Sequence, residues 1–460
     1  MLLSACAVGP VYHTPVQAPA AIADTDPAIV SPAPLEPAWW RSFGDAELDS
    51  LIGRALVANL DLRQAVARVD QARALFDDRN LDRFPRVTSD AGYGRAREQE
   101  PGFTSTPVTV EQAEIGFDAA WEIDLFGRVS HGVEAAKADR DADRADLAGV
   151  RISVAAEVAR NYLEFRGARA RRQVTETNAQ VQRQTLRLTR IRFAAGDEDP
   201  VDVESAQARL SATEASIPPL IAEEAHAAQR LAVLAGQRPG DLDAELAATP
   251  AAQPSRATQL AVGDVSDFLK RRPDVRAAER RLAAETARTG VATADLFPRV
   301  DVTGFIGLLS GDVSTLFKSS SNAWAISPNV AWAAFDLGGA RARLRAQHAR
   351  SDESLALYRE TALKAVEELQ DAITAYRLRQ AEVASLAEQV AAARRAADLA
   401  RDRFKEGDID FLRVLDAERT RLQAEDALTA AETSANTDVV AIYKALGGDL
   451  SPPGETHPPG

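Results

Sequence analysis

The chain of 460 residues has very little sulfur and few aromatic side chains: it contains one cysteine and one methionine, and aromatic residues make up 6%. A chain with a single cysteine cannot form an internal disulfide bond. No run of about eighteen apolar residues occurs, so the sequence predicts no transmembrane helix. Alanine dominates the hydrophobic residues. This composition favours closely packed helices over a core of large side chains.

The sequence also lacks the features of an enzyme or a nucleic-acid-binding protein. A net charge of −14 argues against a nucleic-acid partner. The five histidines are scattered, and no nucleophile or phosphate-binding motif is present. The stretch GDEDPVDVE resembles a calcium loop, but Val201 stands where such a loop needs a ligand. We therefore predict no catalytic residues, no metal site, no cofactor and no enzymatic activity.

The cysteine, Cys6, ends the stretch LSAC, which resembles the processing site of bacterial lipoproteins. Cleavage before this residue would expose a thiol for lipid attachment, and the acyl chains would bind membrane. The charged and apolar regions of a full signal peptide are missing. Two interpretations stay open: the start codon lies further upstream, or the cysteine is incidental. We expect lipidation.

An internal duplication organises the chain. RIRFAAGDEDPVDVESAQARLS at 190–211 is repeated as RDRFKEGDIDFLRVLDAERTRL at 401–422. The motif FPRV occurs at both 84–87 and 297–300, and WEIDLFGRV parallels AAFDLGGAR. In each case the two copies are separated by nearly the same number of residues. They predict five parts: an N-terminal extended segment 1–44, a first repeat 45–235, a linker 236–259, a second repeat 260–447 and a tail 448–460.

Each repeat is predicted to contain a helix, two strands, a long helix, a turn and a returning helix. The strand pairs are expected at 86–125 and 299–336, and the helical turns near 193–202 and 404–413. No proline interrupts 108–199 or 329–451. Within these stretches apolar residues recur every three or four positions, as in coiled coils. Helices of about 65 residues would be about 100 Å long.

The predicted strands alternate large apolar and small or polar residues. Phe117 and Trp121 lie on the apolar side of one strand, and Trp324 and Trp332 on that of another. Such alternation also occurs in soluble sandwiches, but strands of about ten residues with tryptophan near their ends fit a membrane β-barrel. Four strands cannot close a barrel, and open edges are not tolerated in lipid. The sequence therefore predicts an oligomer whose chains share one barrel.

With these features the chain resembles the TolC-like bacterial outer membrane factors, in the OprM/NodT lipoprotein branch. The resemblance rests on LSAC followed by GPVYHTP, on WWRSFGDAELDSLIGRALVANLDLRQAVARVDQARA, on FPRV and WEIDLFGRV around the strands, and on SIPPL and RRPDVRAAERRLAAETA. It covers nearly the whole chain. The sequence departs from the family in its shortened signal peptide and in the opening of GDVSDFLKRRPD.

The resemblance implies a mainly α-helical protein with a membrane β-barrel. Three chains would form one tube, with a twelve-stranded barrel in the outer membrane and a long α-helical barrel in the periplasm. Such a homotrimer is an exit duct for small molecules and drugs. Its implied partners are a periplasmic adaptor (membrane fusion protein), an inner-membrane pump of the resistance-nodulation-division class and outer-membrane lipid, with a lipid anchor at Cys6.

The duplicated turns are then expected to be periplasmic tips that contact the adaptor. Gly196 and Gly407 can adopt positive φ. Asp197 and Asp408 are N-cap candidates for the returning helices, and Asp199 and Asp410 complete the predicted tip contacts.

The resemblance further implies that a face of the second returning helix seals the tube. Leu412, Asp416 and Arg419 share this face. Their first-repeat counterparts Val201, Ser205 and Ala208 lack the charges. Charged pairs between neighbouring chains are expected to hold the gate closed.

Two other functions compete with this one. A soluble coiled-coil scaffold would explain the long helices but not the alternating strands. An outer-membrane channel of a type I protein secretion system would explain both, and it is the alternative function.

Overall fold

The computed structural model describes residues 7–15, 30–31, 33, 35–99, 106–250, 254, 260–262 and 268–448. Cys6 lies outside these ranges, and so do the end of the predicted tail and part of the predicted linker. None of the helices in the described part of the chain is both long enough and apolar enough to cross a membrane.

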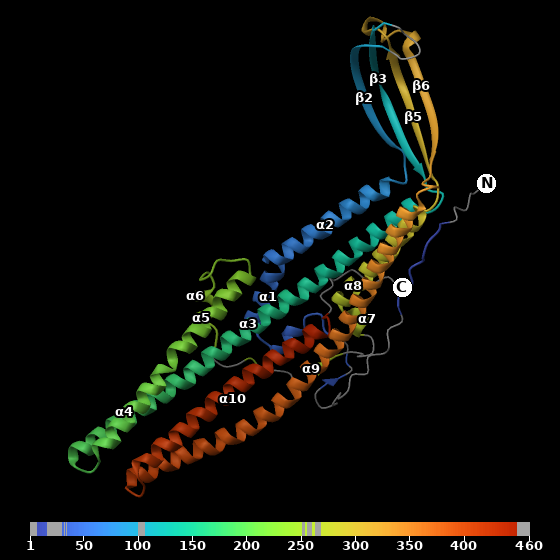
Figure 1. The fold of residues 1–460 in the computed structure, drawn as a ribbon. Coiled ribbons are helices and arrows are strands. Elements are labelled where there is room, and N and C mark those ends of the chain that lie inside the picture. The colour runs from blue at the N-terminus through green and yellow to red at the C-terminus, as the bar shows by residue number, and fades with distance from the viewer. Residues whose placement is uncertain are drawn as a thin grey trace. The chain divides into compact units, whose positions relative to one another are not determined.

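Helices make up most of the structure (Figure 1). The α-helices, in chain order, are α1 Ala46–Ala58, α2 Leu60–Leu81, α3 Arg128–Ala195, α4 Pro200–Ala215, α5 Ile217–Leu234, α6 Asp243–Ala247, α7 Phe268–Arg271, α8 Pro273–Ala294, α9 Leu337–Glu406 and α10 Phe411–Ala445. Short 3-10 segments are η1 Trp39–Phe43, η3 Val313–Thr315 and η4 Ser319–Ser321.

The two long helices, α3 with 68 residues and α9 with 70, confirm the helices predicted from the proline-free stretches. Their apolar stripes are buried, as the spacing predicts: Val158 and Tyr162 on α3, and Leu369 and Tyr376 on α9, are almost inaccessible to solvent. Burial of this apolar stripe stabilises the long helices more than the intrinsic helix propensity of their residues does.

The chain divides into two compact units that do not coincide with the two repeats. The first unit consists of residues 1–17, 67–145 and 276–361, and the second of 18–66, 146–275 and 362–460. Each repeat therefore contributes to both units. The two predicted strand pairs belong to the first unit, and the turns of the helical hairpins belong to the second.

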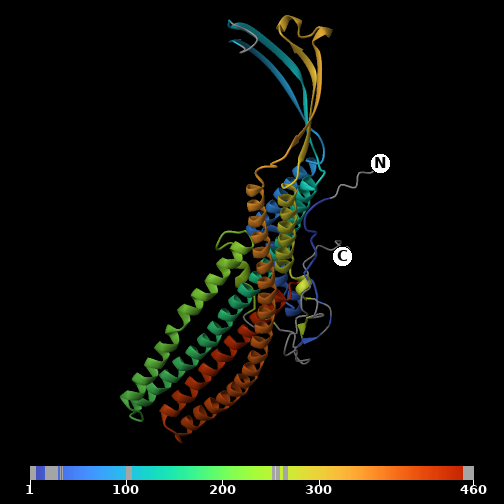
Figure 2. The ribbon, with the colours of Figure 1, turned by 45° about the vertical axis from the view of Figure 1, so that its right-hand side comes forward.

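The first unit contains a four-stranded antiparallel sheet with the order β2-β3-β5-β6 (Figures 1 and 2). Its strands are β2 Arg86–Glu98, β3 Val108–Ile123, β5 Arg299–Ser310 and β6 Asn322–Ala331. Each repeat supplies one hairpin, and β3 pairs with β5 where the two hairpins meet. The edge strands are β2 and β6, which do not pair with each other, so the sheet is open.

The sheet has one apolar and one polar face, because cross-strand partners share a face and successive residues alternate. On the apolar face, Phe117 opposes Ile306, which opposes Trp324. These side chains are exposed, Phe117 at 57% and Trp324 at 76%. On the polar face, Asp118 lies between Thr88 and Phe305. Large apolar side chains exposed along a whole face indicate a covering that a single chain does not provide.

Residues 7–15 follow the helices of the first unit as an extended strap. Val8 donates a backbone hydrogen bond to the carbonyl of Phe126 at 3.1 Å. Tyr12 packs on Ala138 and Ala284 and donates its hydroxyl hydrogen to Glu279. The strap is therefore fastened to α3 and α8.

A buried polar cluster fastens α1 to α3 in the second unit. Asp45 caps α1 by accepting from the backbone N–H groups of Glu47 and Leu48. The same carboxylate accepts from the Tyr162 hydroxyl at 2.9 Å and from Arg166 at 2.6 Å. Arg166 is only 3% exposed, and burial raises the pKa of Tyr162, so its hydroxyl remains a donor. One carboxylate thus serves a helix cap, a phenol and a buried cation.

Two elements differ from the sequence prediction. The first returning helix is not continuous but breaks at Ser216 into α4 and α5, because Pro218 and Pro219 cannot extend the preceding helix, whereas they fit the first turn of a new one. A short parallel pairing joins β1 Val30–Ser31 to β4 Leu260–Ala261. Strands of two residues are too short for an alternating pattern to predict them.

Candidate functional site at the ends of the helical hairpins

The two predicted helical turns, near 193–202 and 404–413, have the same backbone conformation, and we call them the first and second corners. Gly196 has φ 87° and Gly407 has φ 84°. At the first corner, Gly196 N donates to Phe193 O, and Asp197 N donates to Arg192 O. The equivalent bonds at the second corner run from Gly407 to Phe404 and from Asp408 to Arg403. Both are Schellman C-caps, in which glycine adopts the left-handed conformation at little cost.

The predicted N-caps, Asp197 and Asp408, are wrong by two residues. Asp199 caps α4: its side chain accepts from Val201 N at 2.8 Å, and Pro200 follows as the first helical residue. Asp410 occupies the N-cap position of α10 without a side-chain hydrogen bond. The backbone N–H groups of Asp197 and Asp408 instead complete the caps of the preceding helices. The prediction placed the cap directly after glycine and overlooked the connecting residues.

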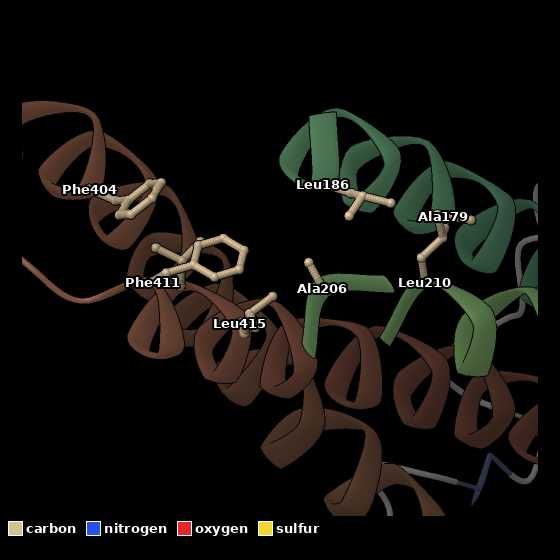
Figure 3. Packing of buried hydrophobic residues seen from close by; sticks show 8 residues of the cluster. Ala179, Leu186, Ala206, Leu210, Phe404, Phe411 and Leu415 are labelled. Atoms are coloured by element: carbon tan, nitrogen blue, oxygen red, sulfur yellow. The ribbon is translucent and has the colours of Figure 1, made fainter. Parts of the chain in front are cut away.

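An apolar cluster joins the two hairpins near these corners (Figure 3). Its members come from α3, α4, α9 and α10: Ala179, Leu186, Ala206, Leu210, Phe404, Phe411, Val414 and Leu415. The Phe404 and Phe411 rings lie with centroids 5.2 Å apart. Such aromatic contacts stabilise the folded state beyond the burial of their apolar surface. The hairpins are therefore packed against each other through their inner faces.

Polar contacts tie the same hairpins together. The guanidinium of Arg192, on α3, lies 4.2 Å from the centre of the Phe404 ring and donates to the Phe404 carbonyl at 3.1 Å. It also pairs with Glu198 at 3.4 Å. Arg192 therefore connects the first corner to the end of α9.

Two buried carboxylates, Glu418 and Glu425, face α3 and α9 from one stripe of α10. Glu425 pairs with Arg394 at 2.7 Å and accepts from Asn178 at 3.1 Å. Glu418 is 5% exposed and lies 3.7 Å from Arg401. Burial raises the pKa of Glu418, and the nearby arginines only partly oppose this effect. This stripe of α10 therefore carries buried negative charges between the hairpins that neighbouring arginines neutralise only in part.

We expect Glu418→Gln to stabilise the packing of α10 against α3 and α9 at neutral pH by about 1 kcal/mol, because the amide has no charge to desolvate. Each arginine beside it keeps another acidic partner, Asp398 for Arg401 and Glu425 for Arg421. A raised carboxyl pKa means that the folded state holds its proton more tightly, so wild-type stability should fall as pH rises above the ordinary glutamate range.

Thermal unfolding of both proteins between pH 4 and pH 8 tests this expectation. The wild type should lose stability relative to Glu418→Gln as pH rises. Parallel pH profiles for the two proteins, or a less stable variant at neutral pH, would contradict it.

The predicted gate residues occupy the opposite, exposed face of α10. Leu412 is 59% exposed, although it is a large apolar residue. Asp416 and Arg419 are exposed and pair with each other within the chain at 2.6 Å. A groove of ≈ 770 Å³ runs between α9 and α10 and is lined by Leu399, Leu412 and Asp416 among others. The structure thus brings the three predicted residues together on one face.

The buried polar residues between the two hairpins were not among the predicted site residues. A signal existed: Glu418 and Glu425 are seven residues apart, as are Arg394 and Arg401. Seven-residue spacing keeps such charges on one seam of packed helices. It could have indicated paired charges between the antiparallel helices α9 and α10.

A sheet with an exposed apolar face and open edges, in one chain with two long helical hairpins, is the architecture of TolC-like outer-membrane channels. The outer membrane efflux protein family model matches residues 51–237 and 265–448. The chain belongs to this family.

Individual relatives agree with this assignment. Outer membrane protein OprJ of Pseudomonas aeruginosa is 31% identical, with 97% of this chain and 94% of that protein covered. Toluene efflux pump outer membrane protein TtgC of Pseudomonas putida is 30% identical, with coverage of 97% and 93%. The solved structure of the outer-membrane channel OprN is 45% identical, covers 97% of this chain and 100% of its own, and superposes with a TM-score of 0.94.

These similarities confirm the predicted family, fold class and efflux function. The protein is an efflux channel of the outer membrane that extends into the periplasm. Similarity over almost the entire chain includes both hairpins and all four strands of the sheet.

Proposed function

We propose that three copies of this chain assemble into one continuous exit duct for small organic molecules. The open-edged sheet supports this most strongly. Edge strands β2 and β6 would leave backbone groups without hydrogen bonds in lipid, and only a closed barrel satisfies them. Phe117, Trp121, Trp324 and Trp332 would form the lipid-facing surface, while the polar face lines the lumen.

Small organic molecules are the proposed cargo, and an inner-membrane pump of the resistance-nodulation-division class is their proposed source. The relative named as a toluene efflux channel supports such cargo. A periplasmic adaptor would hold the duct to the pump, and the two corners at Gly196 and Gly407 would be its contact points. Corners of the same conformation, repeated in three chains, present six similar ends to the adaptor.

Deleting the gene in its own bacterium tests the proposed cargo. The deletion strain should accumulate a fluorescent pump substrate such as ethidium, and expression of the wild-type chain should restore low accumulation. Secretion of proteins by type I systems should stay unchanged. Normal ethidium export combined with lost protein secretion would instead favour the protein-secretion alternative.

We also propose that Cys6 carries the lipid anchor. Mass spectrometry of the mature N-terminus, from a precursor with its full signal peptide, should find diacylation of the cysteine side chain. Cys6→Ala should remove the lipid yet leave assembled channels, because the closed barrel itself inserts in the membrane. A mature protein that keeps the residues before Cys6 and carries an unmodified thiol would contradict lipidation.

Substitution of the corner glycines should uncouple the channel from its pump. Nothing lies within 4 Å of a Cβ built on Gly196 or Gly407, so Gly→Val would not clash with neighbours. The positive φ instead costs a residue with a Cβ about 1–2 kcal/mol, and a β-branched residue fits it worst. We therefore expect both valine variants to distort the corner and to cause drug hypersensitivity at normal channel levels.

Gly→Asn is the matched control, because asparagine tolerates the left-handed region better than other non-glycine residues. The asparagine variants should keep most of the export activity. If the valine variants at both corners export normally, the corners are not the adaptor contact.

A further inference from the structure

One aromatic residue, Phe305, lies on the mainly polar face of the sheet, which also carries Leu309 on the same strand. Its cross-strand partners are Asp118 on β3 and Ala325 on β6. Among the described residues of the four strands, no other aromatic side chain shares this face. The duplication gives a direct comparison, since Phe305 aligns with Gly92 in the first repeat. The ring therefore belongs to one repeat only.

Two glycines form a flat floor under the Phe305 ring. A Cβ on Gly116 would lie 2.6 Å from Cε2 of Phe305, and a Cβ on Gly307 would lie 2.9 Å from its Cζ. Gly116 and Gly307 are themselves cross-strand partners. The ring thus rests on backbone, and it is only half-buried. Its other side is open to the space in front of the polar face.

Negative charge surrounds the ring. Asp118 is its direct cross-strand partner, and Asp90 opposes Gly116. Glu114 is on the same face and lies over Gly92. The arginines of this face stand at the start of its strands: Arg299 pairs with Glu122 and Asp301, and Arg86 pairs with Asp82.

An aromatic face beside carboxylates attracts organic cations, because the ring quadrupole and the acidic side chains act in the same direction. We propose that Phe305 is a cargo-contact residue of the barrel lumen that favours lipophilic cations over neutral or anionic molecules of the same shape. This inference rests on the proposed trimeric duct, in which three Phe305 rings would line one level of the lumen. Small residues around them, such as Gly116, Gly307 and Ala325, leave the rings accessible.

The ring also has a structural role, since an aromatic side chain that lies over glycines covers exposed backbone. The two roles make different predictions. A purely structural ring is replaced by any side chain that covers Gly116 and Gly307. A cargo contact requires the aromatic face itself.

Single-channel recording in planar bilayers separates these roles. Tetraphenylphosphonium, added on the extracellular side, reaches the barrel without passing the helical end of the duct. Phe305→Leu should weaken its block of the current by about two- to fivefold, the effect of one exposed cation–π contact. Phe305→Tyr should keep the wild-type affinity. Tetraphenylborate, which has the same shape and a negative charge, should block every variant weakly.

Phe117→Leu is the matched control, because Phe117 lies on the same sheet but on its apolar face. It should leave the block unchanged. Equal tetraphenylphosphonium affinity in wild type and Phe305→Leu, with normal conductance in both, would overturn the inference. If Phe305→Leu fails to assemble, loss of affinity in Asp118→Asn supports the cation contact, and unchanged affinity there overturns it. If the wild-type chain forms no channels at all, the proposed duct itself fails.

Discussion

Leu412→Ser should make the channel leak at its proposed gate. Leu412 is a large apolar side chain left exposed on α10, beside the groove between α9 and α10. In a trimer, three copies at a narrow end can meet and exclude water. Serine would admit water to the constriction, so single-channel conductance should rise severalfold and cells should become sensitive to vancomycin.

The neighbouring charges should act through electrostatic balance. Asp416 and Arg419 neutralise each other within one chain at 2.6 Å, whereas pairs between neighbouring chains were predicted from the sequence. An exposed pair of this kind contributes only about 0–1 kcal/mol. Removing one partner, however, would leave three like charges around the constriction. Asp416→Ala and Arg419→Ala should therefore each leak.

The double variant Asp416→Ala/Arg419→Ala restores neutrality and should leak less than either single variant. Ser205→Ala, at the equivalent position of the first returning helix, should leave conductance unchanged. Unchanged conductance in Leu412→Ser, Asp416→Ala and Arg419→Ala alike would place the constriction elsewhere, nearer Asp408 and Asp410.

The largest loss of stability is expected for Asp45→Ala. This change removes the cap of α1 and takes the Asp45 carboxylate away from the cation of Arg166, which is almost completely buried. Breaking a buried ion pair from one side costs about 3–5 kcal/mol. We expect a strong fall in the amount of assembled protein in the membrane and rapid digestion of the rest by protease.

Asp45→Asn should give an amount of assembled protein between those of Asp45→Ala and the wild type, because the amide oxygen can still cap α1 but carries no charge. Asp61→Ala, which removes an exposed acidic residue from the first turn of α2, should cost less than about 0.5 kcal/mol. If Asp45→Ala assembles as well as Asp61→Ala, the cluster does not hold α1 to α3.

Periodic features of the structure could be predicted from the sequence, and its long-range polar contacts could not. Alternation identified the faces that carry Phe117 and Trp324, and the repeated glycines located both corners. These signals lie within one element and depend on local geometry. The contacts of Asp45 with Arg166 and of Arg192 with Phe404 join residues more than one hundred positions apart.

Local signals also failed where two chemically similar residues compete. Asp197 and Asp199 both follow Gly196, and only the path of the backbone decides which one caps α4. The break at Ser216 was visible as two prolines, yet prolines in a first helical turn and prolines in a loop look alike in sequence. Likewise, the exposed Leu412 and the buried Leu415 are close on α10, and packing between the hairpins separates them.

In the proposed duct one chain supplies a third of a closed barrel, and cysteine pairs across the sheet edges test this arrangement most directly. In a Cys6→Ala background, one cysteine is placed on edge strand β2, at Ser89, and one on edge strand β6, at successive positions from Trp324 to Val330. Oxidation in intact cells should produce, for at least one pair, a covalent trimer in the outer-membrane fraction. Monomers alone at every β6 position, in protein that has reached the outer membrane, would contradict the shared barrel.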